Sequence, residues 1–434
     1  MERRLRTEPA GLGVGAVWWP PLDDLCRPGE GLVDVIEAEP ESFWVPAPDG
    51  SGFRSMLPQA FAHLQQPKLL HGVGAPLAGP CPPPTGHPET LARDIAALRP
   101  QHISEHLNFT RFRREPGEQP MFAGFMLPPR QSSAGVALAA RNIRRHWAVC
   151  GAIPFAIETP VNYLPPLAGE IPDGEFMAAV AEAADCGILL DLHNLLCNAR
   201  NGRQSVKAFL AALPLERVWE IHLAGGESVS GFWVDSHSGL AEPELIDIAA
   251  ALIPRLPRLQ AVVLEIMPER VAEVGLAAIA RQLGRLRDLW KTRSRNLAPA
   301  PRPANRAPGE ALPDPEGWAS LLGTAVTGQL TPAIDDAAWW EASAPAINLY
   351  RSLITDARAS AVAAAAPQTT RLLLRDRGGT GTRRLLAEFW RQSPQGYTMA
   401  DEGRAFLRFL ETTEPALLGR DAAAVQDLAL LLDG

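Results

Sequence analysis

The run RVWEIHLAG, residues 217–225, joins a short apolar strand pattern to a histidine, His222, and then to small residues. Seven other runs before residue 270 share its character, being short, mostly apolar and bounded by loop residues. They are GVGAVWW (13–19), LVDVIEAE (32–39), KLLHGVG (68–74), HISEHLNF (102–109), PFAIETP (154–160), GILLDLHN (187–194) and AVVLEIMP (261–268). Continuous apolar runs of this length are typical of buried parallel strands.

Helical patterns separate most of these runs. They cover residues 89–98, 134–150, 174–186, 243–253 and, as one long pattern, 269–290. Eight strands that alternate with helices predict an α/β fold, a (β/α)8 barrel of the triosephosphate isomerase type over residues 1–290.

The chain changes character after Trp290. Residues 291–315 hold six prolines and five basic residues, which predicts an exposed linker. Residues 316–434 are rich in Ala and Leu and predict a smaller, mostly helical domain. Within it we expect a helix up to Pro367, a flexible connection at 375–382, two helices separated by a turn at 393–396, and a last helix at 421–434.

Composition narrows the class of protein. The 434 residues are 46% hydrophobic and 21% charged, which indicates a soluble globular protein. A net charge of −8 gives no reason to expect nucleic-acid binding. The sequence contains no run of eighteen apolar residues, so no membrane span is predicted. The N-terminus lacks the apolar core of a signal peptide, and the five cysteines include no CxxC pair, so we expect a cytoplasmic protein with free thiols.

Six of the eight strand runs end on side chains that can bind metal. The C-terminal strand ends of such a barrel meet in one pocket, so residues far apart in sequence are expected to converge there. These residues are His71, His106, Glu158, Asp191, Asn194, His222 and Glu265, and a loop after the seventh strand adds Asp235 and His237. A single strand-end histidine can as easily be structural, but random placement of polar residues would rarely give this coincidence.

Imidazole and carboxylate donors suit iron, zinc or manganese. Nine candidates are too many for one tetrahedral zinc, which takes four ligands, and they suffice for two or three metal ions with open positions. Other polar residues have plainer interpretations. Glu105 is expected to be structural, Cys197 a buried thiol and His193 a weaker candidate, while four histidines are expected to be surface or partly buried residues: His63, His87, His102 and His146.

Six motifs occur in a recognisable order: ISEHLNF, IETPVNY, CGILLDLHNLLCNA, EIHLAGG, VDSHSG and VLEIMP. Together they resemble the multinuclear non-heme iron-dependent oxidases, the family of the methanobactin biosynthesis oxidase, over residues 10–290. The resemblance implies a barrel that holds two to three iron ions and uses dioxygen as co-substrate. The implied metal ligands are His71, His106, Glu158, Asn194, His222, Asp235, His237 and Glu265. The implied catalytic residues are Asp191, His222, Asp235 and His237.

The chain also departs from the family pattern. The family often has Asn at the position of His193 and a carboxylate at that of Ser238, and Ile266 and Met267 replace more polar residues. These positions are expected in the same pocket at the C-terminal ends of the strands, so the departures leave the identity of the substrate undetermined.

The C-terminal region contains the runs INLYRSLITDARASAVAAAAPQTTRLL and LLAEFWRQSPQGYTMADEGRAFLRFLE. They resemble, more weakly, the helical start of the separate partner proteins that recruit precursor peptides to such oxidases. This implies an oxidase fused to its partner domain, with the precursor peptide bound through residues 316–434. The alternative is a generic helical bundle that stabilises the barrel or a dimer.

The resemblance therefore implies an oxidase that modifies a side chain, foremost cysteine, of a ribosomally made precursor peptide. Two other classes stay open on the residues alone. One is a divalent-metal-dependent hydrolase or isomerase on a barrel like that of xylose isomerase, which also places His, Glu and Asp at strand ends. The other is a non-catalytic binding module with a structural metal.

Overall fold

A computed structural model describes residues 11–27, 31–151, 153–294, 314–328, 337–415 and Asp427. Eight parallel strands close into a barrel in the order β1-β14-β11-β10-β9-β6-β5-β2. Their bounds are β1 Gly13–Val17, β2 Val35–Ala38, β5 Lys68–Gly72, β6 Ile103–His106, β9 Phe155–Glu158, β10 Gly187–Asp191, β11 Val218–Leu223 and β14 Ala261–Leu264. Each lies within one of the eight apolar runs, so the predicted barrel is confirmed.

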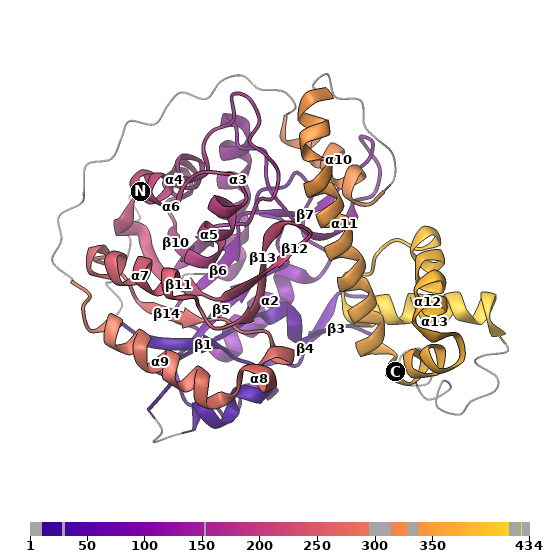
Figure 1. The fold of residues 1–434 in the computed structure, drawn as a ribbon, viewed down its shortest axis with the longest axis horizontal. Coiled ribbons are helices and arrows are strands. Elements are labelled where there is room, and N and C mark those ends of the chain that lie inside the picture. Colours follow the sequence, from indigo (N-terminus) through magenta and orange to yellow (C-terminus); the bar gives the residue numbers. More distant parts are fainter. Residues whose placement is uncertain are drawn as a thin grey trace.

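Helices surround the barrel (Figure 1). They are α1 Leu57–Ala60, α2 His87–Leu98, α3 Ser133–Cys150, α4 Asp173–Ala184, α5 Leu192–Arg200, α6 Val206–Ala212, α7 Pro243–Leu252, α8 Pro268–Val274 and α9 Leu276–Trp290. The expected single helix over 269–290 is wrong. Gly275, with φ 82° and ψ 135°, ends α8 and starts α9, because this backbone conformation lies outside any right-handed helix.

Three two-stranded antiparallel sheets extend from the barrel. They are β3 Trp44–Pro46 with β4 Phe53–Ser55, β7 Phe109–Phe112 with β8 Met121–Leu127, and β12 Gly225–Val229 with β13 Phe232–Gly239. The β12–β13 hairpin replaces the loop expected after the seventh barrel strand. Asp235 and His237 belong to β13, but they lie between Val234 and Gly239, where the pairing with β12 shifts register, so they occupy a bulge of the hairpin.

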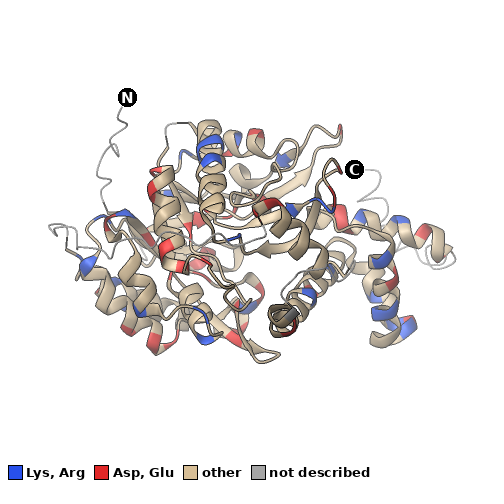
Figure 2. Ribbon diagram, turned by 90° about the horizontal axis from the view of Figure 1, so that it is seen from above, with Lys and Arg blue, Asp and Glu red and all other residues tan. Residues whose placement is uncertain are grey.

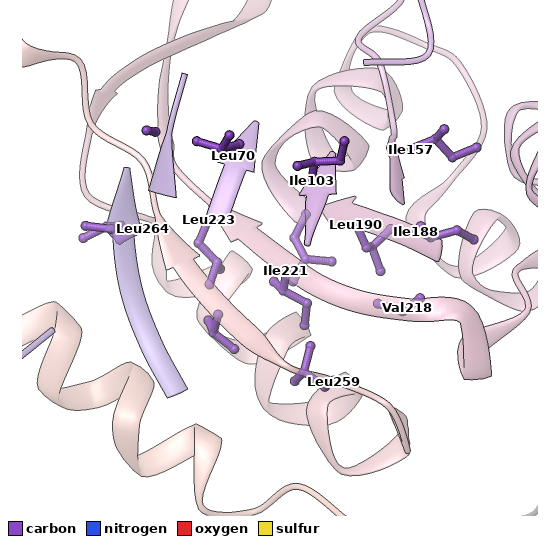
Figure 3. Packing of buried hydrophobic residues seen from close by; sticks show 14 of the residues in the cluster. Leu70, Ile103, Ile157, Ile188, Leu190, Val218, Ile221, Leu223, Leu259 and Leu264 are labelled. Atoms are coloured by element: carbon purple, nitrogen blue, oxygen red, sulfur yellow. The ribbon is translucent and has the colours of Figure 1, made fainter. Parts of the chain in front are cut away.

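The barrel strands separate two apolar regions. Alternate residues, such as Leu70, Ile221 and Leu264, belong to the large core that includes residues of the surrounding helices (Figure 3). The opposite faces of four strands carry a small apolar cluster of Val17, Val35, Leu69, Ala261 and Val263. Because side chains alternate along a strand, the cluster shares its face with the ligand candidates two residues further along. It lies inside the barrel, below them.

The C-terminal helices lie beside the barrel (Figure 1). They are α10 Pro315–Val326, α11 Ala337–Ala365, α12 Pro367–Gln392 and α13 Met399–Thr413. Residues of α10 and α11 share one buried apolar cluster with the β7–β8 hairpin, including Phe112, Trp318 and Tyr350. The helical segment is therefore packed onto the barrel's hairpins.

The expected break at Pro367 and the turn at 393–396 are present. The connection expected at 375–382 is reduced to one residue, because Gly378, with φ 65° and ψ 175°, lies outside the helical conformation and breaks α12 into two helices that meet at a kink. The helix expected at 421–434 lies outside the described residues except Asp427, as does most of the predicted linker. Among the described helices, none is both long and apolar enough to cross a membrane.

Candidate metal centre

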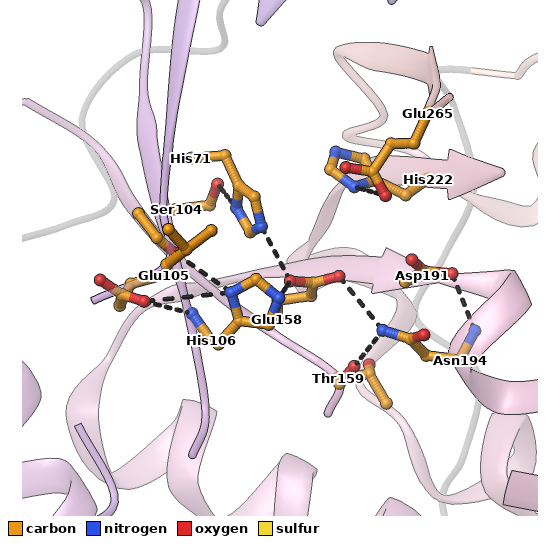
Figure 4. Close-up of polar contacts among 12 residues, drawn as sticks. His71, Ser104, Glu105, His106, Glu158, Thr159, Asp191, Asn194, His222 and Glu265 are labelled. Carbon is orange, nitrogen blue, oxygen red and sulfur yellow. Dashed lines mark hydrogen bonds and ion pairs between the residues drawn. The ribbon is translucent and has the colours of Figure 1, made fainter. Parts of the chain in front are cut away.

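The register between neighbouring barrel strands places the strand-end candidates at the same height along the barrel axis. His106 on β6 pairs with Glu158 on β9, and Asp191 on β10 pairs with His222 on β11. Paired residues of neighbouring parallel strands point to the same side of the sheet, so these four side chains share the barrel interior. Figure 4 shows them facing one another across the end of the barrel.

The first group, here called the Glu158 cluster, consists of Glu158 with His71, His106 and Asn194. Glu158 Oε2 lies 3.0 Å from His71 Nε2 and 2.7 Å from His106 Nε2. Asn194, in the first turn of α5, places its Nδ2 3.4 Å from Glu158 Oε1. The side chains of His71 and Glu158 are each only 2% exposed, so this cluster is closed to solvent.

The second group, here called the Glu265 cluster, consists of Glu265 with Asp191, His222, Asp235 and His237. Ligand atoms of Asp191, His222 and Glu265 lie within 4.8 Å of one another. His237 Nε2 lies 3.3 Å from Glu265 Oε2 and 2.8 Å from Asp235 Oδ1. The side chains of His237 and Asp235 are 21% and 16% exposed, so this cluster opens towards the solvent.

The two clusters are continuous. Ligand atoms of His71, Glu158 and His222 also lie within 4.8 Å of one another, and Asp191 Oδ1 accepts a hydrogen bond from the Asn194 main-chain nitrogen. The structure thus brings all nine sequence candidates into a single group of side chains.

Several of the donor atoms converge without forming aligned hydrogen bonds. Among the described residues, several buried atoms lack an aligned hydrogen-bond partner although nitrogen or oxygen atoms lie close: Glu158 Oε2, Asp191 Oδ2, Asn194 Oδ1, His222 Nδ1 and Nε2, Asp235 Oδ1 and His237 Nε2. Such atoms are costly to bury unless something satisfies them. Nitrogen and oxygen donors that point at a common space are what iron, manganese or zinc requires, so the residues present fit metal ions.

The charges of the site also fit bound metal ions. Burial would lower the pKa of His71, but the negative charges of Glu158 and Glu37 outweigh it and raise the pKa to about 10. Burial and the neighbouring carboxylates of Glu158, Asp235 and Glu265 raise the pKa of Asp191 to about 8. In both residues the neighbouring carboxylates favour the protonated form, and bound cations would neutralise that negative charge instead.

One imidazole is fixed in the form that a metal needs. His106 Nδ1 lies 3.1 Å from the main-chain oxygen of Gly72, which can only accept a hydrogen bond. Nδ1 therefore carries the hydrogen, and in the neutral ring Nε2 keeps its lone pair facing the Glu158 cluster. The second nitrogen of His71, Nδ1, lies 2.8 Å from Ser104 Oγ, which holds that ring in place.

Three buried residues beneath the ligands, Glu37, Glu220 and His102, were not predicted from the sequence to belong to the site. Glu37 on β2 places its Oε2 2.7 Å from His222 Nε2. Glu220 Oε2 lies 2.7 Å from Nε2 of His102, a fully buried histidine that was wrongly expected at or near the surface. The missed signal is the two-residue period of a strand, since Glu220 precedes His222 by two positions and so shares its face.

The residues that the sequence predicts to be structural or weaker candidates, Glu105, His193 and Cys197, lie next to the site. Glu105 accepts hydrogen bonds from the main-chain nitrogens of Ala75 and His106. His193 Nε2 lies 3.8 Å from Asp235 Oδ1 and 3.4 Å from the buried Cys197 Sγ.

Three further histidines lie away from the site. His63 is exposed. His87 is fully buried against Glu41, and His146 is 8% exposed, so both are more enclosed than expected.

Comparison with known proteins identifies the family. Residues 12–273 match a family described as the RiPP precursor modification enzyme MbnB/TglH/ChrH, where RiPP denotes a ribosomally made, post-translationally modified peptide. The chain belongs to this family. The matched region contains all nine ligand candidates, and the C-terminal helices lie beyond it.

Proteins from several bacteria are similar to the part of this chain that matches the MbnB/TglH/ChrH family. A UPF0276 protein of Chromobacterium violaceum is 30% identical over 226 residues, which is 51% of this chain and 79% of that protein. One from Caulobacter sp. (strain K31) is 31% identical over 250 residues, 57% of this chain and 85% of that protein. Among solved structures, D-psicose 3-epimerase from Clostridium cellulolyticum H10 is 10% identical, with a TM-score of 0.41, covering 65% of this chain and all of that one.

Proposed function

We propose that the protein is a dioxygen-dependent oxidase that holds two or three iron ions and modifies a side chain of a ribosomally made precursor peptide. A cysteine is the side chain we propose. The observation that carries the proposal is the convergence of nine nitrogen and oxygen donors, many without hydrogen-bond partners, in a RiPP-modifying enzyme family. No thiolate contributes, which favours iron or manganese over copper(I) or an iron–sulfur cluster.

The two clusters suit different tasks. The closed Glu158 cluster would bind metal in a site without solvent, and the apolar cluster around Leu69 and Val263 excludes water from beneath the ligands. The open Glu265 cluster would receive the peptide, because Asp235 and His237 are its solvent-exposed members. Bound iron would supply the redox chemistry with dioxygen and an anchor for the peptide side chain.

The C-terminal helices would recruit the peptide. They pack on the hairpin that follows β6, and α12 carries six exposed arginines: Arg371, Arg375, Arg377, Arg383, Arg384 and Arg391. The blue bands on these outer helices in Figure 2 are arginines, since the described C-terminal helices contain no lysine. A basic surface beside the barrel favours an acidic segment of a precursor peptide.

The test of the oxidase function is dioxygen uptake by iron-loaded protein in the presence of candidate cysteine-containing peptides encoded near its gene. The proposal expects uptake that depends on both iron and peptide, together with a mass change in the peptide. Turnover of a small substrate under anaerobic conditions, with zinc or manganese and no peptide, would instead indicate the hydrolase or isomerase class.

The test of recruitment is charge reversal of exposed arginines in the intact chain. The double variant R383E/R384E should bind the substrate peptide about tenfold more weakly, as loss of a few rim charges does, and should keep its metal content. E388R, which adds positive charge on the same helix, is the matched control and should not weaken binding. Equal peptide affinity in R383E/R384E and the unaltered protein would sink the recruiting role.

A further inference from the structure

The chain has only three tyrosines, and all three belong to the C-terminal helical segment or pack against it. Tyr163 follows β9, Tyr350 lies on α11, and Tyr397 lies in the segment between α12 and α13. Each makes a contact that leads to a ligand candidate.

The first contact runs through two tyrosines in series. The Tyr350 hydroxyl, on a fully buried side chain, accepts a hydrogen bond from the main-chain nitrogen of Tyr163 at 3.3 Å. The Tyr163 hydroxyl in turn accepts one from the main-chain nitrogen of Asp235 at 3.1 Å. The two rings pack at 5.4 Å between centroids. The C-terminal helix α11 is thereby connected to the strand position that presents Asp235 to the Glu265 cluster.

The second contact is a close approach of Tyr397 to the loop after β5. Its ring packs between Phe53 of β4 and Phe122 of β8, each at 5.4 Å between centroids. Its hydroxyl lies against Gly74, where an added Cβ would come within 2.2 Å of the oxygen. Only glycine therefore fits at position 74 while Tyr397 is in place.

That loop supports the Glu158 cluster. Gly72, two residues before Gly74, provides the carbonyl that holds His106 Nδ1. Val73 and Ala75 donate their main-chain nitrogens to Glu41 and Glu105. A shift of the loop at Gly74 would therefore move the hydrogen bond that orients the His106 ring.

We propose that the C-terminal helices form part of the metal centre by positioning its ligands, Asp235 through Tyr350 and Tyr163, and His106 through Tyr397 and the loop at Gly74. The three tyrosines are positioning residues and touch no ligand side chain in this role. In addition to recruiting the peptide, the helical segment would then set the geometry of both clusters through the way it packs on the barrel. This inference rests on the proposed metal centre but not on the oxidase reaction or on peptide binding.

The test uses cobalt(II) bound to the full-length protein, because its visible spectrum reports ligand geometry and needs neither dioxygen nor peptide. Y163F should weaken cobalt affinity about tenfold, as loss of a ligand-supporting hydrogen bond does, and should shift the visible bands. Y350F acts one step further from Asp235 and should produce a smaller shift in the same direction.

The Gly74 contact is tested by rescue. G74A should change the cobalt spectrum because the new methyl group displaces the Tyr397 hydroxyl and the loop. Adding Y397F removes that oxygen, so G74A/Y397F should restore much of the original spectrum, a coupling that independent sites would not show. L373A is the matched control. Leu373 is buried in an apolar cluster among the C-terminal helices, so this variant should lower Tm and leave the spectrum unchanged.

An unchanged cobalt affinity and spectrum in both Y163F and G74A would overturn the inference even if Tm falls, because the helices would then only stabilise the barrel. Failure of the unaltered protein to bind cobalt, iron or manganese would overturn the metal centre and this inference together. A full set of spectral shifts in a protein without oxidase activity would leave the positioning role standing and count against the proposed reaction alone.

Discussion

The Glu158 and Glu265 clusters lie side by side but are built differently. Every member of the Glu158 cluster comes from a barrel strand or the first turn of the helix that follows one, and the cluster is closed. The Glu265 cluster takes Asp235 and His237 from the β12–β13 hairpin, outside the barrel sheet, and is open. Under the proposed function, the closed half would hold metal rigidly and the open half would meet the substrate.

The largest effect is expected from E158A, in the closed half. Glu158 Oε2 is the atom shared by His71 and His106, so its loss removes the centre of that cluster. Metal affinity should fall by at least about a hundredfold, the upper end of the loss seen for residues that merely support ligands. Elemental analysis after dialysis should then find at least one ion fewer per chain.

E244A provides the control for E158A, because Glu244 lies on the surface in an ion pair with Arg200. If E158A kept the full metal content of this control, the Glu158 cluster would not be a metal site.

A smaller loss of metal is expected from D235A, in the open half. Asp235 contacts His237, but the remaining members of both clusters keep their donors. Metal content should fall less than in E158A, while peptide oxidation should fall by about a hundredfold or more, as for other groups that act on the reacting atoms. Comparing metal content and turnover in E158A and D235A tests whether the Glu158 cluster holds metal while the Glu265 cluster acts on the substrate. A D235A protein with normal turnover would contradict it.

The smallest effect concerns stability and lies outside the centre. Burial, and then the charge of His87, lower the pKa of His146 to about 4. An unfolded histidine binds its proton near pH 6.5, so between pH 6.5 and pH 4 the unfolded chain holds more protons than the folded one. Stability should therefore fall as the pH drops through this range, by up to roughly 3 kcal/mol from this residue.

H146L should remove that part of the acid sensitivity, because leucine does not titrate. The measurement is urea unfolding of metal-free protein at pH 7 and pH 4.5, compared between H146L and the unaltered chain. An equal loss of stability in both proteins would show that His146 does not titrate as its burial implies.

The barrel and its nine ligand candidates could be predicted from the sequence because both follow from simple periodicity. Short apolar runs give strands, and parallel strands in a barrel must end on one side, so side chains such as His71 and Glu158 have to meet. The family resemblance, drawn from six motifs, is confirmed by the match over residues 12–273.

The rest depended on details that the sequence leaves open. LVDVIEAE contains Asp34, Glu37 and Glu39, and only the strand register selects Glu37 as the neighbour of His222. The same holds for His102, whose partner Glu220 lies on a strand that is distant in sequence. Single glycines break two helical patterns: Gly275 separates α8 from α9, where one helix was expected, and Gly378 alone breaks α12, where a longer connection was expected.

The contact between the C-terminal helices and Tyr163 was also beyond sequence reasoning. Tyr350 and Tyr163 are 187 positions apart, and no local pattern relates them. Their hydrogen bond becomes visible only when α11 is packed on the hairpins.

The most direct test of the account is the amount of metal per chain, measured by elemental analysis on full-length protein produced with added iron. Two to three iron ions per chain are expected, with at least one lost in E158A. Less than one metal ion per chain in the unaltered protein, under conditions in which it is folded, would contradict the multinuclear centre on which the proposed function depends.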